Sequence, residues 1–369
     1  MEVRSGMVGS LARRMRLGAF IYRMARWHGQ YVVSRQARPL ACGYYLTNRC
    51  NFRCAFCNIW RHRPPFTVPE EKAKDTIRQL GDLGLVYFSI SGGEPLLVPY
   101  VFDLLAHARA CGVLYTHLVS NGFLMDEARA RELDRSKLSE VSFSLDGPPD
   151  THDTVRGQQH AYAHVLQAVE NVKRYAPNTA IVINTILDPH QPEHALHSVA
   201  TAKGLGVAIK VQPLNAHPNL NPDAPEPPRP RELNRQERDA FLAVIKTLRQ
   251  ARNVVSSHAF LDNYAAYMLD RKRLAFTHSP CIYGYHHVEF FNNQLFPCLE
   301  GLDWHDGFDP YERPLEALFA SPEYRQTLER LRGCQGCLRN YYVCYYEPRL
   351  SFPIWNLVGS RIRSPRAWT

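Results

Sequence analysis

Residues 41–57 read ACGYYLTNRCNFRCAFC, an apolar strand pattern that runs directly into three closely spaced cysteines. Residues 41–46 favour a β-strand, because they are rich in apolar and aromatic side chains and end at turn-forming residues. Cys50, Cys54 and Cys57 follow on the loop beyond this strand. Thiolates are the usual ligands of iron–sulfur clusters. Three of them leave one iron of a [4Fe–4S] cube open, and an open metal position can bind a substrate or cofactor directly.

A purely structural reading of these cysteines is the alternative. Positions 50, 54 and 57 share one helical face, and buried Cys behaves as a small apolar residue. The neighbours Asn51, Arg53 and Asn58 make a poor core segment, however. No apolar run reaches the roughly 18–20 residues that span a bilayer, and no secretory signal is recognisable at the start. The expected compartment is the reducing cytosol, where cysteines serve more often as metal ligands or catalytic thiols than as disulfides.

Strand and helix patterns alternate from residue 40 onward. The expected strands are 41–46, 85–90, 115–119, 140–145, 179–186 and 207–213. The expected intervening helices are 69–82, 100–111, 125–133, 159–174 and 192–203. Six strands alternating with helices predict an α/β fold with a parallel sheet and right-handed crossovers, in the form of a partial (β/α)6 TIM-like barrel. In such folds the chemistry lies at the carboxyl ends of the strands.

A second motif, Ser91-Gly92-Gly93-Glu94-Pro95, ends the second expected strand. Glycines let the backbone approach a ligand closely, and a carboxylate can accept a charge-assisted hydrogen bond from an ammonium group. Together with Cys-x3-Cys-x2-Cys and Phe56 before the last cysteine, this motif resembles the radical S-adenosylmethionine (radical SAM) superfamily over residues 40–215.

The resemblance implies a cofactor site and a reaction. Gly92, Gly93 and Glu94 would bind S-adenosylmethionine beside the cluster. Its ribose and methionyl part would meet polar residues at the ends of the next two strands, and its carboxylate would meet an arginine, although a solvated loop arginine is the alternative for that last position. One electron from a reductant such as flavodoxin or ferredoxin would then yield a 5′-deoxyadenosyl radical that removes hydrogen from an unreactive C–H bond. The further cofactor residues implied are Ser120, Asn121, Ser144, Asp146 and Arg156.

A second group of cysteines lies near the C-terminus. Cys281 and Cys298 flank an expected hairpin, residues 285–298, with Asn292-Asn293 as its turn, and Cys334 and Cys337 form a Cys-x2-Cys pair. Four thiolates suit a second iron–sulfur cluster, and a structural zinc would use the same ligands. After a radical SAM barrel the layout resembles the twitch and SPASM auxiliary-cluster domains, and five cysteines rather than seven favour the one-cluster twitch form. Cys344 is left as a further ligand, a hydrogen donor or a spare thiol.

Other notable side chains have a structural expectation. Cys42 and Cys111 are expected in the core, and His286-His287 is expected at the surface or in packing. The expected divisions are a basic N-terminal helix region (1–39), the radical SAM core (40–215), a Pro-rich linker (216–234) and an auxiliary-cluster domain with a hairpin and helices (235–369).

The basic charge is concentrated at the N-terminus. Residues 1–40 hold eight arginines and one acid, Glu2, whereas the whole chain has a net charge of +9. Residues 8–27 form an expected basic amphipathic helix, which either docks on the domain or lies at an anionic membrane surface. Nucleic acid is not an expected partner, because the basic residues are not spread along a groove with aromatics.

Three functions follow as hypotheses. The first is a radical SAM enzyme that oxidises, joins or epimerises a small molecule. The second is a peptide-modifying maturase, whose leader-binding module would come from a separate partner, since about 40 residues before the barrel are too few for one. The third, a non-catalytic iron–sulfur carrier, is disfavoured because a carrier needs no second polar pocket beside its cluster.

Overall fold

The computed structural model describes residues 7–214, 233–269, 281–299 and 306–334, with the side chains of 7–17 left aside. A single sheet of eight strands organises these ranges, in the order β6-β5-β4-β3-β2-β1-β7-β8. Its first six strands are parallel and follow one another along the chain, as expected for a partial barrel. They are β1 Ala41–Thr47, β2 Tyr87–Gly92, β3 Tyr115–Ser120, β4 Glu140–Ser144, β5 Ala180–Leu187 and β6 Ala208–Pro213.

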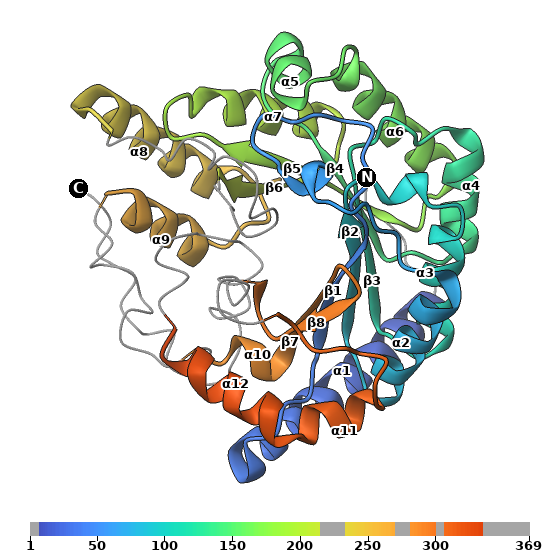
Figure 1. The fold of residues 1–369 in the computed structure, drawn as a ribbon. Helices are drawn as coiled ribbons and strands as arrows, with labels where there is room; N and C mark the ends of the chain where they lie inside the picture. The colour runs from blue at the N-terminus through green and yellow to red at the C-terminus, as the bar shows by residue number, and fades with distance from the viewer. Residues whose placement is uncertain (1–6, 215–232, 270–280, 300–305, 335–369) are drawn as a thin grey trace.

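Helices cover the outer face of this curved sheet, so the opposite face is the concave one (Figure 1). Their amphipathic patterns place apolar side chains against the strands, in one continuous core. The helices between the strands are α2 Glu70–Asp82, α3 Val101–Ala110, α4 Glu127–Arg135, α6 Ala161–Tyr175 and α7 Glu193–Gly204. These strand and helix predictions are confirmed, with no boundary more than two residues away.

Three short elements near the strand ends were not predicted. Helix α5, Pro149–Arg156, begins with Pro149 and Asp150 directly after Pro148, a composition that also favours a turn. It ends at Gly157, whose left-handed conformation (φ 61°) stops the helix. The single-turn helices η1 Ile59–Arg61 and η2 Pro95–Leu97 lie within the loops that carry the cysteine and glycine motifs.

The predicted C-terminal hairpin is confirmed, and it is part of the barrel sheet. Strands β7 His287–Phe291 and β8 Gln294–Phe296 pair antiparallel. Both turn residues, Asn292 and Asn293, have positive φ (51° and 60°), which suits a two-residue hairpin turn. The hairpin begins two residues later than expected, because residues 283–286 form the short helix α10. Strand β7 then pairs parallel to β1, so the sheet continues across the expected domain division.

Four further helices complete the described C-terminal part. They are α8 Arg235–Gln250, α9 His258–Leu269, α11 Leu315–Ala320 and α12 Pro322–Arg332. A capping box between Asn234 and Glu237 begins α8, and the Phe241 ring packs edge-on against Tyr264 of α9, 5.4 Å between centroids.

The N-terminal helix α1, Met7–Ser34, is longer than predicted and docks on the domain. The Trp27 ring is buried, stacks on Tyr31 at 5.3 Å and donates a hydrogen bond to the Tyr285 carbonyl. His286 also meets the Trp27 ring edge-on, and both His286 and His287 are buried, so packing and not exposure accounts for this pair. The docking interpretation of the helix is therefore confirmed for one of its faces.

Candidate functional site

The loop after β1 carries Cys50, Cys54 and Cys57 and is fixed at its base by two polar side chains. The Thr47 hydroxyl donates to the Phe66 carbonyl (2.8 Å) and accepts from the Arg49 amide (3.1 Å). Asn48 donates to the His62 carbonyl (2.9 Å) and accepts from the Phe66 amide (2.8 Å). These bonds close residues 48–66 into a loop whose two ends meet at the carboxyl end of β1.

The three cysteines of this loop are free thiols and only partly buried. The Phe52 amide donates to the Cys50 sulfur at 3.4 Å. Burial raises the pKa of Cys50 to about 12 despite that bond, and burial together with the negative charge of Cys54 raises the pKa of Cys57 to about 11. In the metal-free chain Cys50 and Cys57 are therefore protonated at neutral pH, and cationic iron would stabilise them as thiolates.

Gly92 and Gly93 are packed against the first residues of the cysteine loop. A Cβ on Gly92, which has φ +128°, would lie 2.3 Å from the Thr47 carbonyl oxygen, and one on Gly93 would lie 2.1 Å from the Arg49 carbonyl oxygen. The Gly93 amide donates to the Thr47 carbonyl at 2.7 Å. The glycines thus allow the loop after β2 to touch the loop after β1.

Glu94 is fully buried between three donors of its own chain. One carboxylate oxygen accepts from the Leu96 amide (3.0 Å) and the Ser120 hydroxyl (2.9 Å), and the other accepts from the Asn121 amide (2.8 Å). Burial raises the pKa of Glu94 to about 7, against the lowering effect of these bonds. The carboxylate holds the ends of β2 and β3 together.

Asn121 extends this network back to the cysteines. Its side-chain nitrogen Nδ2 donates to the Asn51 side-chain oxygen at 2.8 Å, and its side-chain oxygen Oδ1 accepts from the Phe123 backbone amide at 3.0 Å. Asn51 lies directly beside Cys50 in the chain. Sequence reasoning missed this role for Asn51, and the residue type alone gave no signal for it.

Asp146 and Arg156 form a buried ion pair beside the cysteines. The Arg156 Nε donates to Asp146 Oδ2 at 2.8 Å, and Asp146 Oδ1 accepts from the Ile186 amide. Another guanidinium nitrogen lies 4.0 Å from the Cys54 sulfur, and the guanidinium carbon lies 5.0 Å from the centre of the Phe56 ring. Burial opposes this charge, yet the Asp146 carboxylate and the Cys54 thiolate raise the pKa of Arg156 above its usual value. The structure places Arg156 at the site and not in a solvated loop.

Ser144 and the next two strands add a polar row on the concave face of the sheet. Ser144 of β4 is paired in register with Asn184 of β5, which is paired with Lys210 of β6. The Asn184 side-chain oxygen is buried and has no hydrogen-bond partner in the part of the chain that the structure describes. Asn184 was not predicted as a site residue, although its place one strand beyond Ser144 could have indicated it.

His117 of β3 lies on the same face of the sheet, nearer to the amino end of β4, where it is paired in register with Glu140. Its Nδ1 meets the hydroxyls of Tyr87 (2.7 Å) and Ser89 (2.8 Å), and its Nε2 meets the Ser142 hydroxyl (2.8 Å). Burial, with a smaller contribution from Lys210, lowers the pKa of His117 to about 3. This part of the concave face therefore carries a neutral histidine held by three hydroxyl groups.

Three of the five C-terminal cysteines lie among the described residues. Cys281 and Cys298 are buried, Cys334 is partly buried, and all three are free thiols. The Cys281 amide donates to the Arg332 carbonyl at 3.1 Å, so Cys281 meets the end of α12 just before Cys334. Cys337 and Cys344 lie outside the described residues. Elsewhere, Cys42 is fully buried as expected, whereas Cys111 is only partly buried at the end of α3.

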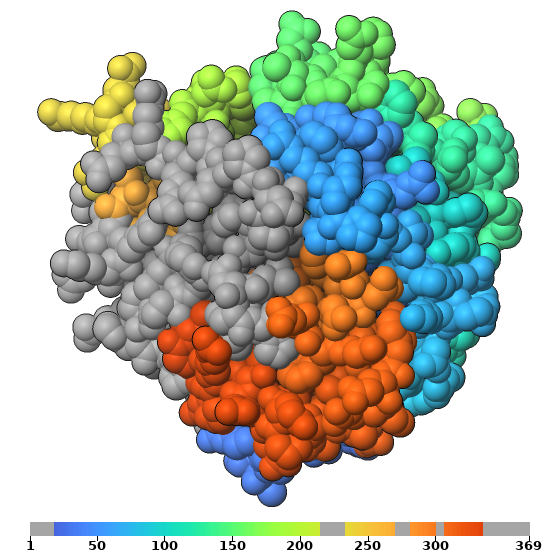
Figure 2. Space-filling model, viewed as in Figure 1, coloured from blue at the N-terminus to red at the C-terminus, as the bar shows by residue number. Residues whose placement is uncertain are grey.

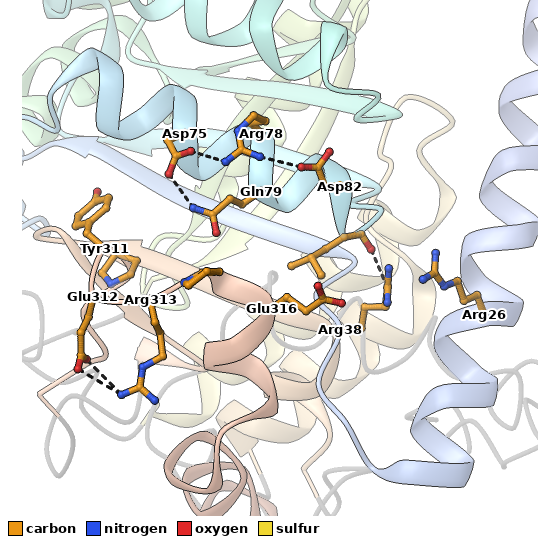
Figure 3. A pocket seen from close by; sticks show the side chains of 13 residues that line it. Arg26, Arg38, Asp75, Arg78, Gln79, Asp82, Tyr311, Glu312, Arg313 and Glu316 are labelled. Carbon is orange, nitrogen blue, oxygen red and sulfur yellow. Dashed lines mark hydrogen bonds and ion pairs between the residues drawn. The ribbon is translucent and has the colours of Figure 1, made fainter.

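A separate cavity lies on the outside of the sheet. It measures about 590 Å³ and is lined mostly by charged residues, which come from α1 (Arg26), from Arg38 after it, from α2 and from residues 310–316 at the start of α11 (Figure 3). Arg78 donates to Asp75 (2.6 Å) and Asp82 (3.0 Å), which neutralise it. None of the residues that line this cavity belongs to the cysteine loop or to the strand ends described above.

Comparison with a family model gives the first relationship. Residues 44–202 match the model of the Radical SAM superfamily. That segment contains the cysteine loop, the glycine motif and the Asp146–Arg156 pair.

Curated relatives match over less than half of the chain. One is the AdoMet-dependent heme synthase of Methanosarcina barkeri, 29% identical over 178 residues, 47% of this chain and 50% of that protein. Another is the PqqA peptide cyclase of Xanthomonas axonopodis pv. citri, 29% identical over 171 residues, 44% of each chain. The chain thus spans half or less of the length of these relatives.

Similarity in fold extends further along the chain. Streptococcus suis SuiB bound to precursor peptide SuiA superposes with a TM-score of 0.62 at 16% identity, over 87% of this chain and 74% of that one. The structure of anSMEcpe with bound AdoMet and Cp18Cys peptide gives a TM-score of 0.59 at 17% identity, over 88% of this chain and 100% of that one. The shared fold therefore reaches beyond residue 202 into the C-terminal part.

Proposed function

We propose that this chain, whose residues 44–202 belong to the radical SAM superfamily, binds a [4Fe–4S] cluster through Cys50, Cys54 and Cys57 and uses it to cleave S-adenosylmethionine. The observation that carries the proposal is that hydrogen bonds connect three segments at the carboxyl ends of the strands. The cysteine loop, the glycine motif and the end of β3 are linked by the Gly93–Thr47, Glu94–Asn121 and Asn121–Asn51 hydrogen bonds.

The cysteines suit a cluster better than a single ion. Over the described ranges, no three His, Cys, Asp or Glu side chains are close enough to hold one metal ion. In a cubane each thiolate binds a separate iron, so the ligands are spread more widely. The three free, partly buried thiols are suited to that arrangement, and the buried cation Arg156 beside Cys54 would offset part of the negative charge of the thiolates.

The cluster and S-adenosylmethionine, when bound, would supply a 5′-deoxyadenosyl radical that removes hydrogen from the substrate. The chain would bind and orient them. Gly92, Gly93 and Glu94 would line one side of the cofactor, and the opposite side would be formed from the ends of β3 and β4 and from α5. The proposed contacts on that opposite side are Ser120, Asn121, Ser144, Asp146 and Arg156.

Glu94 and Arg156 act in this proposal mainly by position. Glu94 is surrounded by chain donors, so its first effect is to fix the Ser120 hydroxyl and the Asn121 amide. Arg156 keeps Asp146 in place, and Asp146 in turn holds the Ile186 amide of β5. A cofactor carboxylate that meets Arg156 would share that cation with Asp146.

A second, auxiliary [4Fe–4S] cluster on Cys281, Cys298, Cys334 and Cys337 is the next part of the proposal. The contact between the Cys281 amide and the Arg332 carbonyl supports it, because it brings Cys281 to the helix end that precedes Cys334. An auxiliary cluster could accept an electron from the substrate radical, which favours oxidation or bond formation. Zinc on the same thiolates is the alternative, and Cys344 would be a ligand, a hydrogen donor or a spare thiol.

A small molecule is the proposed substrate, and a flavodoxin or ferredoxin the proposed reductant. Similarity to a heme synthase supports this choice. A peptide-modifying maturase is the second candidate, which similarity to a peptide cyclase and the shared fold with a precursor-peptide complex favour. Incubation of the reconstituted enzyme with candidate peptides and with tetrapyrrole precursors, followed by mass spectrometry, would separate the two.

Anaerobic reconstitution tests the proposal directly. About eight irons per chain are expected for two [4Fe–4S] clusters, and about four would remove the auxiliary cluster. Addition of reductant and S-adenosylmethionine should then release 5′-deoxyadenosine. A chain that holds its iron but releases no 5′-deoxyadenosine would refute the proposed cleavage of S-adenosylmethionine.

A further inference from the structure

Exposed apolar side chains are concentrated on α1. Seven large apolar side chains are exposed among the described residues, and five of them belong to this helix. Val33 is 86% exposed, Tyr22 64% and Ile21 57%. Isolated exposed apolar residues are ordinary, but a cluster on one element indicates an interaction surface. The five are Phe20, Ile21, Tyr22, Val32 and Val33.

Four of these side chains form a stripe along one side of the helix. At 3.6 residues per turn, Ile21 and Val32 lie almost in line, as do Tyr22 and Val33, within an arc of about 120°. We call these four residues the outer stripe. Trp27 and Tyr31 lie on the opposite side and hold the helix to the domain. The helix therefore has two apolar faces, of which one is docked and the other is exposed.

Positive charge accompanies the outer stripe. The 28 residues of α1 include five arginines and no Asp or Glu. Arg26, an exposed residue of this helix, lies at the charged cavity (Figure 3), and at 3.6 residues per turn it follows about 20° beyond Val33 around the helix; exposed Arg35 follows directly after the helix. Neither arginine has a carboxylate within 4.0 Å among the described residues. Before α1 the chain adds one further arginine, Arg4, and one acid, Glu2, so the whole region is cationic.

We propose that α1 lies on an anionic membrane surface, with the outer stripe in the interface and Arg26 and Arg35 against lipid phosphates. Apolar side chains on one face, flanking arginines and an aromatic at the boundary are the pattern of an interfacial helix. Among the described residues, no helix is long and apolar enough to cross a bilayer. The helix forms the lower edge of the molecule in the space-filling view, beyond the orange C-terminal segments (Figure 2). This proposal goes beyond the radical chemistry and does not depend on it.

Charge favours a membrane over the other possible occupants. A second copy of this chain would bring two cationic helices together, which is unfavourable for a stripe flanked by arginines that have no carboxylate partner in the part of the chain that the structure describes. An anionic bilayer supplies both the apolar layer and the negative charge, and each basic residue near its surface contributes about 1 kcal/mol, or about fivefold in binding.

Vesicle flotation of the full reconstituted chain tests the proposal. We expect the chain to float with vesicles of equal parts phosphatidylglycerol and phosphatidylcholine and to stay unbound with phosphatidylcholine alone. The double variant Ile21→Ser/Val33→Ser should lose binding by about tenfold or more, because it removes apolar area from the interface. Val255→Ser, a change at a residue 55% exposed elsewhere, is the matched control and should float as the parent does.

Arginine variants test the charge. Arg26→Gln should weaken flotation about fivefold, and high salt should abolish this difference. Arg135→Gln, at an exposed arginine of α4, is the matched control. Free phosphate should not compete at concentrations similar to the lipid, since the apolar stripe needs a bilayer.

Two outcomes would overturn the proposal. One is equal flotation of the parent and the stripe variant. The other is a dimer in light scattering that the stripe variant abolishes while neither protein binds vesicles, which would assign the stripe to a second copy. Iron content and 5′-deoxyadenosine release, measured in parallel, show whether a variant is folded, so failure here is distinct from failure of the radical chemistry.

Discussion

The two cysteine regions of this chain lie in different surroundings. Cys50 and Cys54 lie on a loop beside buried charged groups, since the Glu94 carboxylate acts on Cys50 and an Arg156 nitrogen lies 4.0 Å from the Cys54 sulfur, whereas Cys57 of the same loop packs against a small apolar cluster. Cys281 and Cys298 are buried within the main hydrophobic core, at either side of the β7–β8 hairpin. A polar surrounding can orient a charged cofactor, whereas an apolar one excludes it. The difference fits the proposed roles, in which the first region would bind a charged cofactor and the second would hold a metal cluster.

Removal of one thiol from each region should give the largest effect, on bound iron and on 5′-deoxyadenosine release. Cys54→Ala should abolish 5′-deoxyadenosine release and lower iron by about four per chain, because the first cluster loses one of three ligands. Cys298→Ala should lower iron by a similar amount and leave 5′-deoxyadenosine release measurable. Iron analysis and chromatography check both variants. Loss of 5′-deoxyadenosine in both would mean that the regions do not differ in the way we describe.

The buried ion pair gives the next largest effect. Arg156→Leu leaves the Asp146 carboxylate buried without its cation, which costs about 3–5 kcal/mol of stability. Urea unfolding should show this loss, and cofactor cleavage should fall as well. Arg156→Lys should recover part of each. Arg129→Leu, at an exposed pair with Asp126, is the control and should change stability by less than about 1 kcal/mol.

The pH dependence of stability sharpens the description of the first region as polar. The pKa of Glu94 is about 7 in the folded chain and 4.5 ordinarily. A carboxyl with a raised pKa stabilises the fold fully below pH 4.5, and this contribution is lost as the pH rises to about 7. The loss amounts to at most about 3 kcal/mol. Unfolding of metal-free Glu94→Gln should show a flatter profile over this window, and an unchanged slope would contradict the assignment.

A pair of glycine substitutions gives the smallest effect and compares the two regions most directly. In Gly93→Ala the new Cβ would meet the Arg49 backbone, so the cysteine loop must move. In Gly284→Ala it would first meet the Leu328 side chain, which can rotate. We expect Gly93→Ala to cost about 1–3 kcal/mol and to reduce bound iron, and Gly284→Ala to cost less. Gly204→Ala, with open space around it, is the control.

Most of the fold could be predicted from the sequence, because the strand and helix patterns of residues 40–213 are local. The hairpin turn at Asn292-Asn293 was also readable, since both residues tolerate positive φ. The pairing of β7 with β1 could not be predicted, because it joins segments about 245 residues apart and no local signal encodes a partner strand.

The candidate site was predictable in its residue types and less so in its contacts. The motifs indicated Glu94 and Arg156, yet the burial of Glu94 among three chain donors depends on how β2 and β3 meet. The close approach of Gly93 is to the chain's own Arg49, where a ligand was expected. Asn51 and Asn184 escaped prediction because an asparagine in a loop or strand is unremarkable until its neighbours are known.

The parallel pairing of β1 with β7 also has a consequence for biosynthesis. Strand β1 emerges from the ribosome long before β7, so its outer edge stays without a hydrogen-bonding neighbour until residues 287–290 are made. The cysteine loop follows directly after that same strand. A cluster delivered to the nascent chain would therefore bind a loop whose strand is not yet paired on both sides. A chain cut short before β7 would carry the first cysteines beside an open, aggregation-prone edge. Completion of the sheet beside the cysteine loop thus requires translation to pass residue 290.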